Sequence, residues 1–192
     1  MMTPADLTYI SLLRAIKSEG NLRPSRNHPV QSHFGLPITE FHSFPLVSVR
    51  KTAWNLAIRE MEWFLSGESK CPDDLYGWWG GQLSPRGCYY GGYGNQFRDF
   101  NEYFDQVGEL VDSIKEHPLS RRLILTAWNP AEMAIITKLN ENDKTPTTCH
   151  TTLAQFYVCN NKLSMKSYQR SADMLLGVPH NWVQSWAMLM WF

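Results

Sequence analysis

Residues 149–173, CHTTLAQFYVCNNKLSMKSYQRSAD, determine the fold of the last third of the chain. Asn160 and Asn161 stand at its centre, and asparagine tolerates the left-handed backbone that a two-residue hairpin turn requires. We therefore expect residues 151–158 and 163–171 to form two antiparallel strands joined at this Asn-Asn pair. A Cys-His pair precedes the hairpin and an Arg-Ser pair ends it.

The side chains that flank this hairpin are suited to covalent chemistry on a nucleotide. Cys149 next to His150 can attack an electron-poor carbon. Arg170 with Ser171 can hold a phosphate, and the amide of Asn181 can pair with a donor and an acceptor of a heterocycle. An isolated Cys-His pair is more often structural, but this ordered series favours the catalytic interpretation.

The rest of the chain alternates helical periodicity with β-type and glycine-rich segments. Helices are expected over residues 3–19, 53–65 and 104–116, and strands over residues 41–49 and 122–128. Residues 22–37 are expected to form a loop. Residues 67–94 are expected to form a long ordered, ligand-facing segment that is too rich in glycine for regular elements.

Composition indicates one globular domain without a general affinity for polyanions. The 192 residues are 43% apolar, which is enough for a sizeable core. Lys plus Arg equal Asp plus Glu at 18 each, so nucleic acid and membrane surfaces are not expected partners. No apolar run of about 18 residues occurs. We therefore expect a cytoplasmic protein that holds any phosphate with a local cluster.

The cysteines do not form a metal-binding pattern. Cys71, Cys88, Cys149 and Cys159 include no Cys-x-x-Cys pair and no His/Cys spacing of a zinc site. No metal is expected. Three of them, Cys71, Cys88 and Cys159, are expected to be buried structural thiols.

Short blocks elsewhere in the chain extend the pattern around Cys149. They are FPL at 44–46, EMEWFL at 60–65, YGNQFR at 93–98, SRR at 120–122, AWN at 127–129 and QFYV at 155–158. With the blocks around Cys149, Arg170 and Asn181, they resemble the thymidylate synthases and the related deoxypyrimidine-nucleotide hydroxymethylases. The resemblance runs from about Arg26 to the C-terminus.

The resemblance implies a fold and a reaction. The fold is α+β, with a large, twisted, mostly antiparallel sheet packed with helices and a homodimer formed through the sheet. The reaction transfers a one-carbon unit from 5,10-methylenetetrahydrofolate to carbon 5 of dUMP, and reduction by the folate then gives dTMP. Addition of a thiolate to carbon 6 makes carbon 5 carbanion-like, which uracil is not by itself.

The resemblance also implies catalytic roles. Cys149 is the nucleophile with His150 as its polar neighbour, Glu60 is the general acid/base, and Tyr93 and Asp173 line the pocket. The periodicity of residues 53–65 places Glu60 at the edge of a buried helix face. A carboxylate there must be hydrogen-bonded or titrate at a raised pH, and either suits proton transfer.

The phosphate-binding residues implied by the resemblance come from separate segments. They are Arg170 and Ser171 and, reaching across the dimer interface to the partner's phosphate, Arg121 and Arg122. Gln169, directly before Arg170, is implied as a further substrate-binding residue. Arg26 resembles the remaining clamp arginine, with Arg23 as an alternative. Several guanidinium groups around a dianion give bidentate, charge-assisted contacts, although surface ion pairing is the ordinary alternative for an arginine.

Asn181 resembles the residue that reads the base. Its amide can donate to O4 and accept from N3–H of uracil, whereas the cytosine-preferring relatives place an acid here. Alternatively, Asn181 caps the helix that follows. For the folate, Trp78 and Trp79 stand near the expected stacking tryptophan, and one of them can instead belong to the core.

Two departures from the family pattern carry expectations of their own. Cys149 lies six residues before Gln155, one more than in the family, so a β-bulge is expected between His150 and Ala154. The chain also reaches Phe192 within an apolar helix, before the family's His-x-Tyr segment and folate-closing tail. We therefore expect a fragment or the product of a split or interrupted gene, with a separate C-terminal segment as a partner.

Two alternatives to dTMP synthesis remain. Water can capture the one-carbon unit and give 5-hydroxymethyl-dUMP, and the departure of residues 181–184 from the common synthase pattern keeps this alternative open. The other is a catalytically incomplete half that binds nucleotide, a complementary chain or messenger RNA. The neutral net charge argues against RNA.

Overall fold

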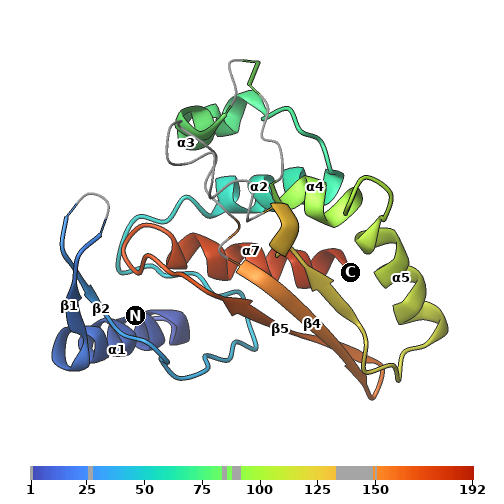
Figure 1. Cartoon of the computed structure of the whole chain (residues 1–192). Coiled ribbons are helices and arrows are strands. Elements are labelled where there is room, and N and C mark those ends of the chain that lie inside the picture. The colour runs from blue at the N-terminus through green and yellow to red at the C-terminus, as the bar shows by residue number, and fades with distance from the viewer. Residues whose placement is uncertain (1, 26–27, 84–85, 88–91, 133–148, 150) are drawn as a thin grey trace.

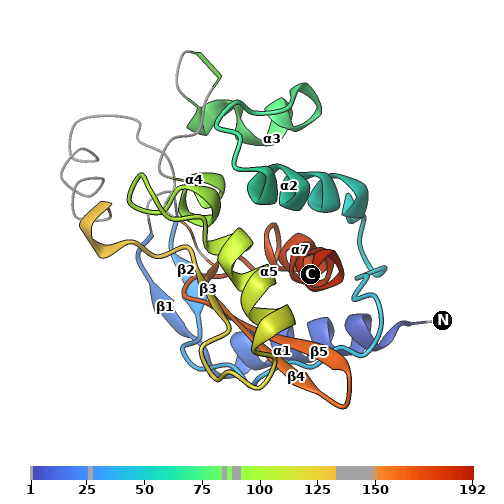
Figure 2. The same cartoon turned by 90° about the vertical axis from the view of Figure 1, so that its right-hand side faces the viewer.

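Helices and antiparallel strands share one core (Figure 1), as the α+β expectation requires. The computed structural model describes residues 2–25, 28–83, 86–87, 92–132, 149 and 151–192. Figure 2 shows α7 (Val178–Trp191) almost end-on, between α2 (Trp54–Ser66) and the hairpin of β4 (Thr151–Cys159) and β5 (Lys162–Gln169). Residues of α2, α7 and the hairpin are therefore placed to meet.

The predicted hairpin is confirmed. β4 and β5 pair antiparallel, and Asn160 and Asn161 between them have φ values of 51° and 56°. β3 (Ile124–Thr126) pairs with the other edge of β4, so the order is β3-β4-β5. Within the described residues this sheet has three strands, fewer than the large sheet that was expected, and β3 is shorter than the predicted strand over 122–128.

The predicted bulge at the start of β4 is also confirmed. Thr151 pairs with Gln169 and Leu153 with Tyr168, so Thr152 is an extra residue on β4. Without this bulge the extra residue would turn every later side chain to the other face. With it, Ala154 and Phe156 face the core.

The inner face of the sheet packs on α7. Phe156 is buried, and its ring centroid lies 4.7 Å from that of Phe192 at the end of α7. Met188 of α7 and Leu125 of β3 belong to the same core. Near the end of α7, Phe192 is therefore partly buried, whereas Met190 and Trp191 are exposed.

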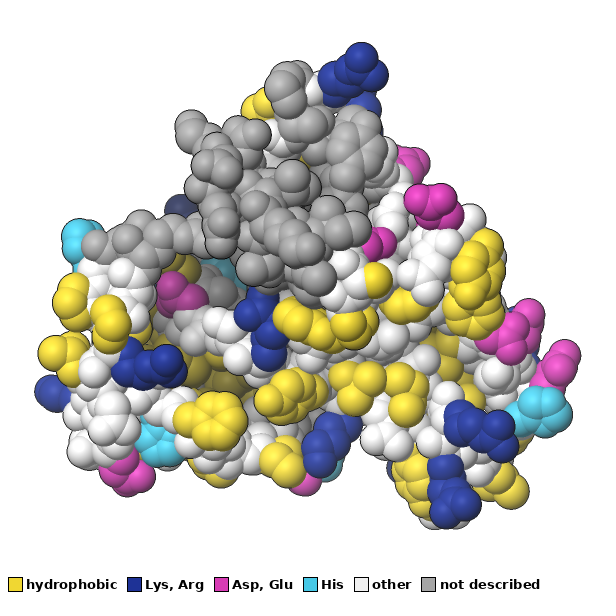
Figure 3. Space-filling view, in the orientation of Figure 1, with side chains coloured by type: hydrophobic (Ala, Val, Ile, Leu, Met, Phe, Trp, Pro, Cys, Tyr) yellow, Lys and Arg dark blue, Asp and Glu magenta, His cyan; other side chains and the backbone are white. Residues whose placement is uncertain are grey.

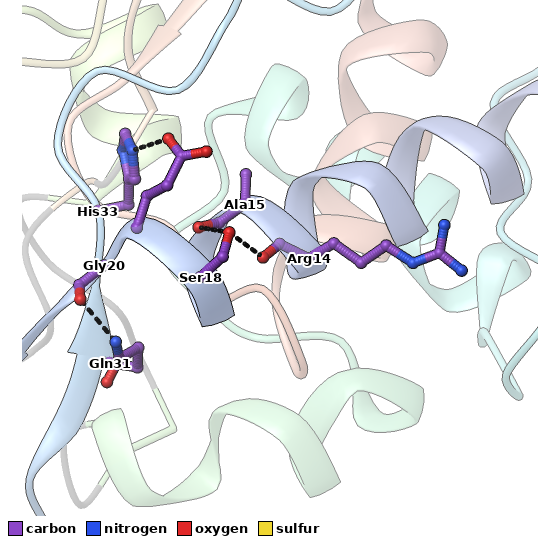
Figure 4. Close-up of polar contacts among 7 residues, drawn as sticks. Arg14, Ala15, Ser18, Gly20, Gln31 and His33 are labelled. Carbon is purple, nitrogen blue, oxygen red and sulfur yellow. Dashed lines mark hydrogen bonds and ion pairs between the residues drawn. The ribbon is translucent and has the colours of Figure 1, made fainter.

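The first helix, α1 (Pro4–Glu19), begins and ends where the sequence predicts. Thr3 accepts from the Asp6 N–H and Asp6 accepts from the Thr3 N–H, which is a capping box. At the other end the short strands β1 (Asn21–Arg23) and β2 (Val30–Ser32) pair. Gln31 Nε2 donates to Gly20 O at 2.6 Å in this corner (Figure 4). The expectation of a loop throughout residues 22–37 is therefore wrong.

Residues 41–49 do not form the expected strands, and at the end of this segment Asp6 binds two backbone N–H groups. Its carboxylate accepts from the backbone N–H groups of Ser48 and Val49 at 2.6 and 3.0 Å and from the Ser48 hydroxyl at 2.7 Å. The backbone donors that a strand would pair are thus used by a side chain. This contact fixes the segment that leads into α2.

The glycine-rich segment contains short helices, contrary to the expectation of no regular elements. They are η1 (Asp73–Leu75), α3 (Tyr76–Trp79), η2 (Gly80–Gln82) and α4 (Tyr93–Arg98). The helix predicted over 104–116 is present as α5 (Gln106–Glu116), which begins after an Asp105 cap. Among the described residues, no helix is both long and apolar enough to span a bilayer.

Asp6→Asn should lower the melting temperature, because an amide cannot replace the carboxylate as an acceptor for all of these donors. The loss at neutral pH should be about 2 kcal/mol. Burial acts to raise the pKa of Asp6, but the hydrogen bonds outweigh it and hold the pKa well below its usual range. Its contribution is therefore present above about pH 4 and lost at lower pH.

Thermal unfolding followed by circular dichroism from pH 3 to 7 measures this effect. Asp112→Asn on the exposed side of α5 is the matched control. Equal melting temperatures for the Asp6 and Asp112 variants would contradict the role of Asp6.

Candidate active site

Glu60 lies inside the buried face of α2 rather than at its edge, with 7% of its surface exposed. Trp79 Nε1 donates to Glu60 Oε1, and Gln184 Nε2 donates to Glu60 Oε2. Burial raises the pKa of Glu60 to about 7, against the opposing effect of these two hydrogen bonds. A carboxyl group with this pKa can exchange a proton near neutral pH.

A chain of amides extends from Glu60 to the sheet. Gln184 Oε1 accepts from Asn181 Nδ2 at 2.9 Å, and Asn181 Oδ1 accepts from Gln169 Nε2 at 2.8 Å. Since α7 begins at Val178, Asn181 lies within the helix and does not cap it. The helix-cap interpretation is therefore wrong, and Asn181 is part of a polar network.

Cys149 lies directly before β4 with 1% of its surface exposed. Arg170 Nε donates to the Cys149 carbonyl oxygen at 3.0 Å, and the guanidinium carbon lies 5.2 Å from the centroid of the Trp128 ring. Burial raises the pKa of the Cys149 thiol to about 12, whereas the Arg170 charge acts to lower it and Glu132 acts to raise it. The thiol is therefore neutral at pH 7 in this state.

Tyr93 fixes the start of β4. Its hydroxyl accepts from the Thr151 N–H at 3.1 Å, and its ring stacks on Phe64 of α2 at a centroid distance of 4.5 Å. Because Thr151 pairs with Gln169, the contact between Tyr93 and Thr151 lies at the same end of the hairpin as the amide chain. Glu60, Trp79, Gln169 and Asn181 thus form one network, which adjoins Cys149, Tyr93 and Arg170.

The two candidate tryptophans have different surroundings. Trp79 is buried, with its ring edge-on to Trp63 and Phe64, and it donates to Glu60. Trp78 is 38% exposed and lies edge-on to His180 of α7, at a centroid distance of 5.0 Å. Trp79 is therefore the core residue of the pair, and Trp78 has the accessible ring.

Asp173 shapes the loop between β5 and α7. Its Oδ1 accepts from the N–H groups of Leu175 and Leu176 at 2.9 and 2.8 Å, and its carbonyl oxygen accepts from the first residues of the next helix. Ser171 is exposed in the same loop. Neither is joined to the Glu60 network by a hydrogen bond between described side chains.

Among the described candidate arginines, Arg23, Arg121 and Arg122 form no hydrogen bond to this network. Arg121 and Arg122 are exposed in the turn before β3, and neither forms an ion pair with a described residue. Arg23 is exposed at the end of β1, and Arg26 and His150 lie outside the described residues. The choice between Arg23 and Arg26 therefore stays open.

The remaining cysteines differ from one another. Cys71 is buried, and burial and then the charge of Glu60 raise its pKa to about 11. Cys159 is exposed, which corrects the expectation of a buried thiol, because it ends β4 on the outward-facing side. Cys88 lies outside the described residues. No group of three or more His, Cys, Asp or Glu that could hold a metal occurs in the described part of the chain.

A cavity of about 20 Å³ lies beside the amide chain. Its lining includes Asn181, Gln184 and Ser185 of α7 together with Thr151 and Ser167 of the hairpin. The rest of the lining is mostly apolar and includes Met61, Phe64 and Met188, and the volume is room for one water-sized molecule.

Three residues of the site were not predicted from the sequence: Gln184, Trp128 and Glu132. Gln184 could have been noticed as a polar residue one turn after Asn181 within an apolar helix, where a buried amide needs partners. The contacts of Trp128 and Glu132 depend on chain segments far from them in sequence, so no local signal indicates them.

Comparison with known proteins identifies the family of this chain. The sequence model of the thymidylate synthase family matches residues 7–192. The chain belongs to the thymidylate synthase family. A thymidylate synthase from Francisella philomiragia subsp. philomiragia is 33% identical over 193 residues, which cover 94% of this chain and 70% of that protein. Family membership gives a function of the thymidylate synthase type, a methyltransferase, and does not separate it from the hydroxymethylase alternative.

Alkylation by iodoacetamide should distinguish the described cysteines. Cys159 should react first, because it is exposed, whereas burial and the raised pKa values should protect Cys149 and Cys71. Peptide mass spectrometry over a time course at pH 8 measures the order, with chain unfolded in guanidinium as the control. Cys149 labelling as fast as Cys159 would contradict the burial of the thiol.

Proposed function

We propose that this member of the thymidylate synthase family transfers a one-carbon unit from 5,10-methylenetetrahydrofolate to carbon 5 of dUMP and gives dTMP. The observation that carries the proposal is the position of Cys149 beside Arg170, next to the network of Glu60 and Asn181. The residues proposed as nucleophile, anion-binding group, base-reading amide and proton-exchanging acid therefore lie in one region, which supports the proposal.

Each residue has a role that its surroundings support. The Cys149 sulfur would form a bond to carbon 6 and, when the product leaves, that bond would break again. Its raised pKa in the free chain means that the thiol must lose its proton when substrate binds, and a positive charge at Arg170 favours the thiolate. Glu60 would move a proton at the base, and Asn181 would read its edge.

The tetrahydrofolate would supply the one-carbon unit and the hydride that reduces it. The chain offers the accessible ring of Trp78 for stacking, beside the α2–α7 contact that holds Glu60. Asp173 and Ser171 stay candidate ligand contacts on the loop that follows β5. His150, which follows Cys149 in the sequence, is proposed as the polar neighbour of the nucleophile. The expected cytoplasmic location also stays a prediction.

Formation of 5-hydroxymethyl-dUMP is the second candidate. The cavity of about 20 Å³ beside Asn181 and Gln184 supports it, because a water held there would lie next to the base-reading amide. If water captures the one-carbon unit before reduction, a carbon–oxygen bond forms in place of a carbon–hydrogen bond. Mass spectrometry of the product separates the two candidates.

A homodimer through the sheet is part of the proposal. The outer face of the sheet carries exposed apolar side chains (Figure 3), namely Ile124, Leu153, Tyr157 and Tyr168. Such a face favours association. Arg121 and Arg122, in the turn before β3, would then reach the partner's phosphate together with Arg170 and Ser171 on the other subunit.

The test of the reaction uses Cys149→Ser. Turnover should be lost, because oxygen is a far weaker nucleophile, while binding of dUMP should persist, because the arginines are unchanged. Fluoro-dUMP with methylenetetrahydrofolate should give a mass adduct on Cys149 of the unaltered chain. Cys159→Ser is the control and should retain both turnover and adduct.

Retained turnover in Cys149→Ser, or an adduct on Cys159, would contradict the assignment. Binding of dUMP without turnover or adduct in the unaltered chain would favour the nucleotide-binding half.

The dimer is tested by Tyr157→Asp, which places a charge on the outer face of the sheet. Sedimentation velocity should show a dimer for the unaltered chain and a monomer for this variant. Tyr103→Asp, at an exposed tyrosine outside the strands, is the matched control. A monomer at micromolar concentration in the unaltered chain would contradict the proposed interface.

A further inference from the structure

The hydrogen bonds of the amide chain all run in the same donor-to-acceptor sense, from Gln169 through Asn181 and Gln184 to Glu60. An amide accepts through its oxygen and donates through its nitrogen, so the orientation of one amide in a series fixes the orientation of the next. Gln184 is the link, with 6% of its surface exposed and with both ends of its amide in use. Its contact to Glu60 joins residues 124 positions apart in the chain.

The ionised form of Glu60 requires one orientation of the Gln184 and Asn181 amides. A carboxylate only accepts, so the Gln184 nitrogen must face it and the Gln184 oxygen must face Asn181. Asn181 then donates to Gln184 and accepts from Gln169, and these are the contacts at 2.9 and 2.8 Å. The orientation of the Asn181 amide thus follows from the charge on Glu60.

A proton on Glu60 requires the opposite orientation of the Gln184 and Asn181 amides. Trp79 can only donate, so it keeps Oε1 as an acceptor, and the proton is directed to Oε2, which faces Gln184. That O–H needs an oxygen partner, which Gln184 supplies when its amide turns over. Asn181 must then present its oxygen to Gln184 and its nitrogen to Gln169.

We propose that Gln184 is a positioning residue that fixes the orientation of the Asn181 amide and couples it to the proton on Glu60. This inference rests on the proposed function. The uracil edge presents an acceptor at O4 and a donor at N3, and cytosine presents the reverse. The two orientations of Asn181 therefore favour opposite bases, and protonation of Glu60 shifts the preference between dUMP and dCMP.

The charged and titratable groups near Glu60 come from the elements packed against α2. On α7 the charged or titratable side chain is His180, whose Nε2 accepts from the Ala53 N–H at 3.2 Å. On α4 Arg98 is paired with Asp105 at 2.9 Å. Before η1, Cys71 experiences the charge of Glu60, but its pKa of about 11 keeps it neutral, and Asp73 and Asp74 are exposed.

Gln184→Met tests the coupling, because methionine has a similar length and cannot join the amide chain. The ratio of kcat/KM for dUMP to that for dCMP should change about tenfold between pH 6 and pH 9 in the unaltered chain and stay constant in the variant. The control is Gln31→Met, the same change in the corner shown in Figure 4. A ratio independent of pH in the unaltered chain, or the same dependence in Gln184→Met, would overturn the proposal.

A titration without nucleotide separates this inference from the proposed function. Infrared difference spectra, with Glu60→Gln as the blank, report the protonation of Glu60. Asn181→Ala should raise the midpoint by about half a pH unit, because Gln184 then loses the donor that strengthens its bond to the carboxylate. The same substitution in a Gln184→Met background should have no effect.

An unchanged midpoint in Asn181→Ala with Gln184 intact would overturn the coupling, and this comparison does not require Gln184→Met to fold. If the unaltered chain transfers no one-carbon unit, the proposed function fails, while this titration still decides whether Gln184 couples Asn181 to Glu60.

Discussion

The burial of the Glu60 carboxylate is the constraint on which the arrangement of this chain depends. A buried carboxylate must be hydrogen-bonded or take up a proton, since an unpaired charge in an apolar core is strongly unfavourable. Here its oxygens bring together α2, the Trp79 donor of α3 and the Gln184 donor of α7. The amide chain then extends the contact to β5 through Gln169. Hydrogen bonds that begin at one acidic side chain thus connect three helices and the hairpin.

Glu60 and Cys149 differ in protonation because their surroundings differ. Glu60 titrates near neutral pH because burial raises its pKa more than its two hydrogen bonds lower it, whereas burial keeps the Cys149 thiol neutral. Arg170 makes two contacts here: its guanidinium group lies over the Trp128 ring, and its Nε donates to the Cys149 carbonyl oxygen. The free chain therefore holds the proposed nucleophile as a neutral, buried thiol next to the arginine that is proposed to activate it.

Local patterns were sufficient to predict much of the fold. Helix periodicity predicted α1, α2 and α5, and the Asn160-Asn161 pair predicted the hairpin. The bulge was expected from the family resemblance, because the spacing from Cys149 to Gln155 is one residue longer than in the family. Residues 41–49 were predicted wrongly, and at the end of this segment the backbone N–H groups of Ser48 and Val49 bind Asp6, a residue about forty positions away. Gln184 was missed as a site residue, since its partner lies on another helix. In both cases the contacts join segments that are distant in sequence, which local patterns do not indicate.

The most direct test of the role of Glu60 compares tritium release from carbon-5-labelled dUMP by the unaltered chain and by Glu60→Gln. Glutamine keeps the acceptor for Trp79 but cannot exchange the proton. With methylenetetrahydrofolate present, the account predicts release by the unaltered chain and a loss of roughly 100-fold to 10,000-fold in the variant, with dUMP still bound. Equal release rates for the two chains would contradict the claim that the buried carboxylate organises and drives the chemistry of this site.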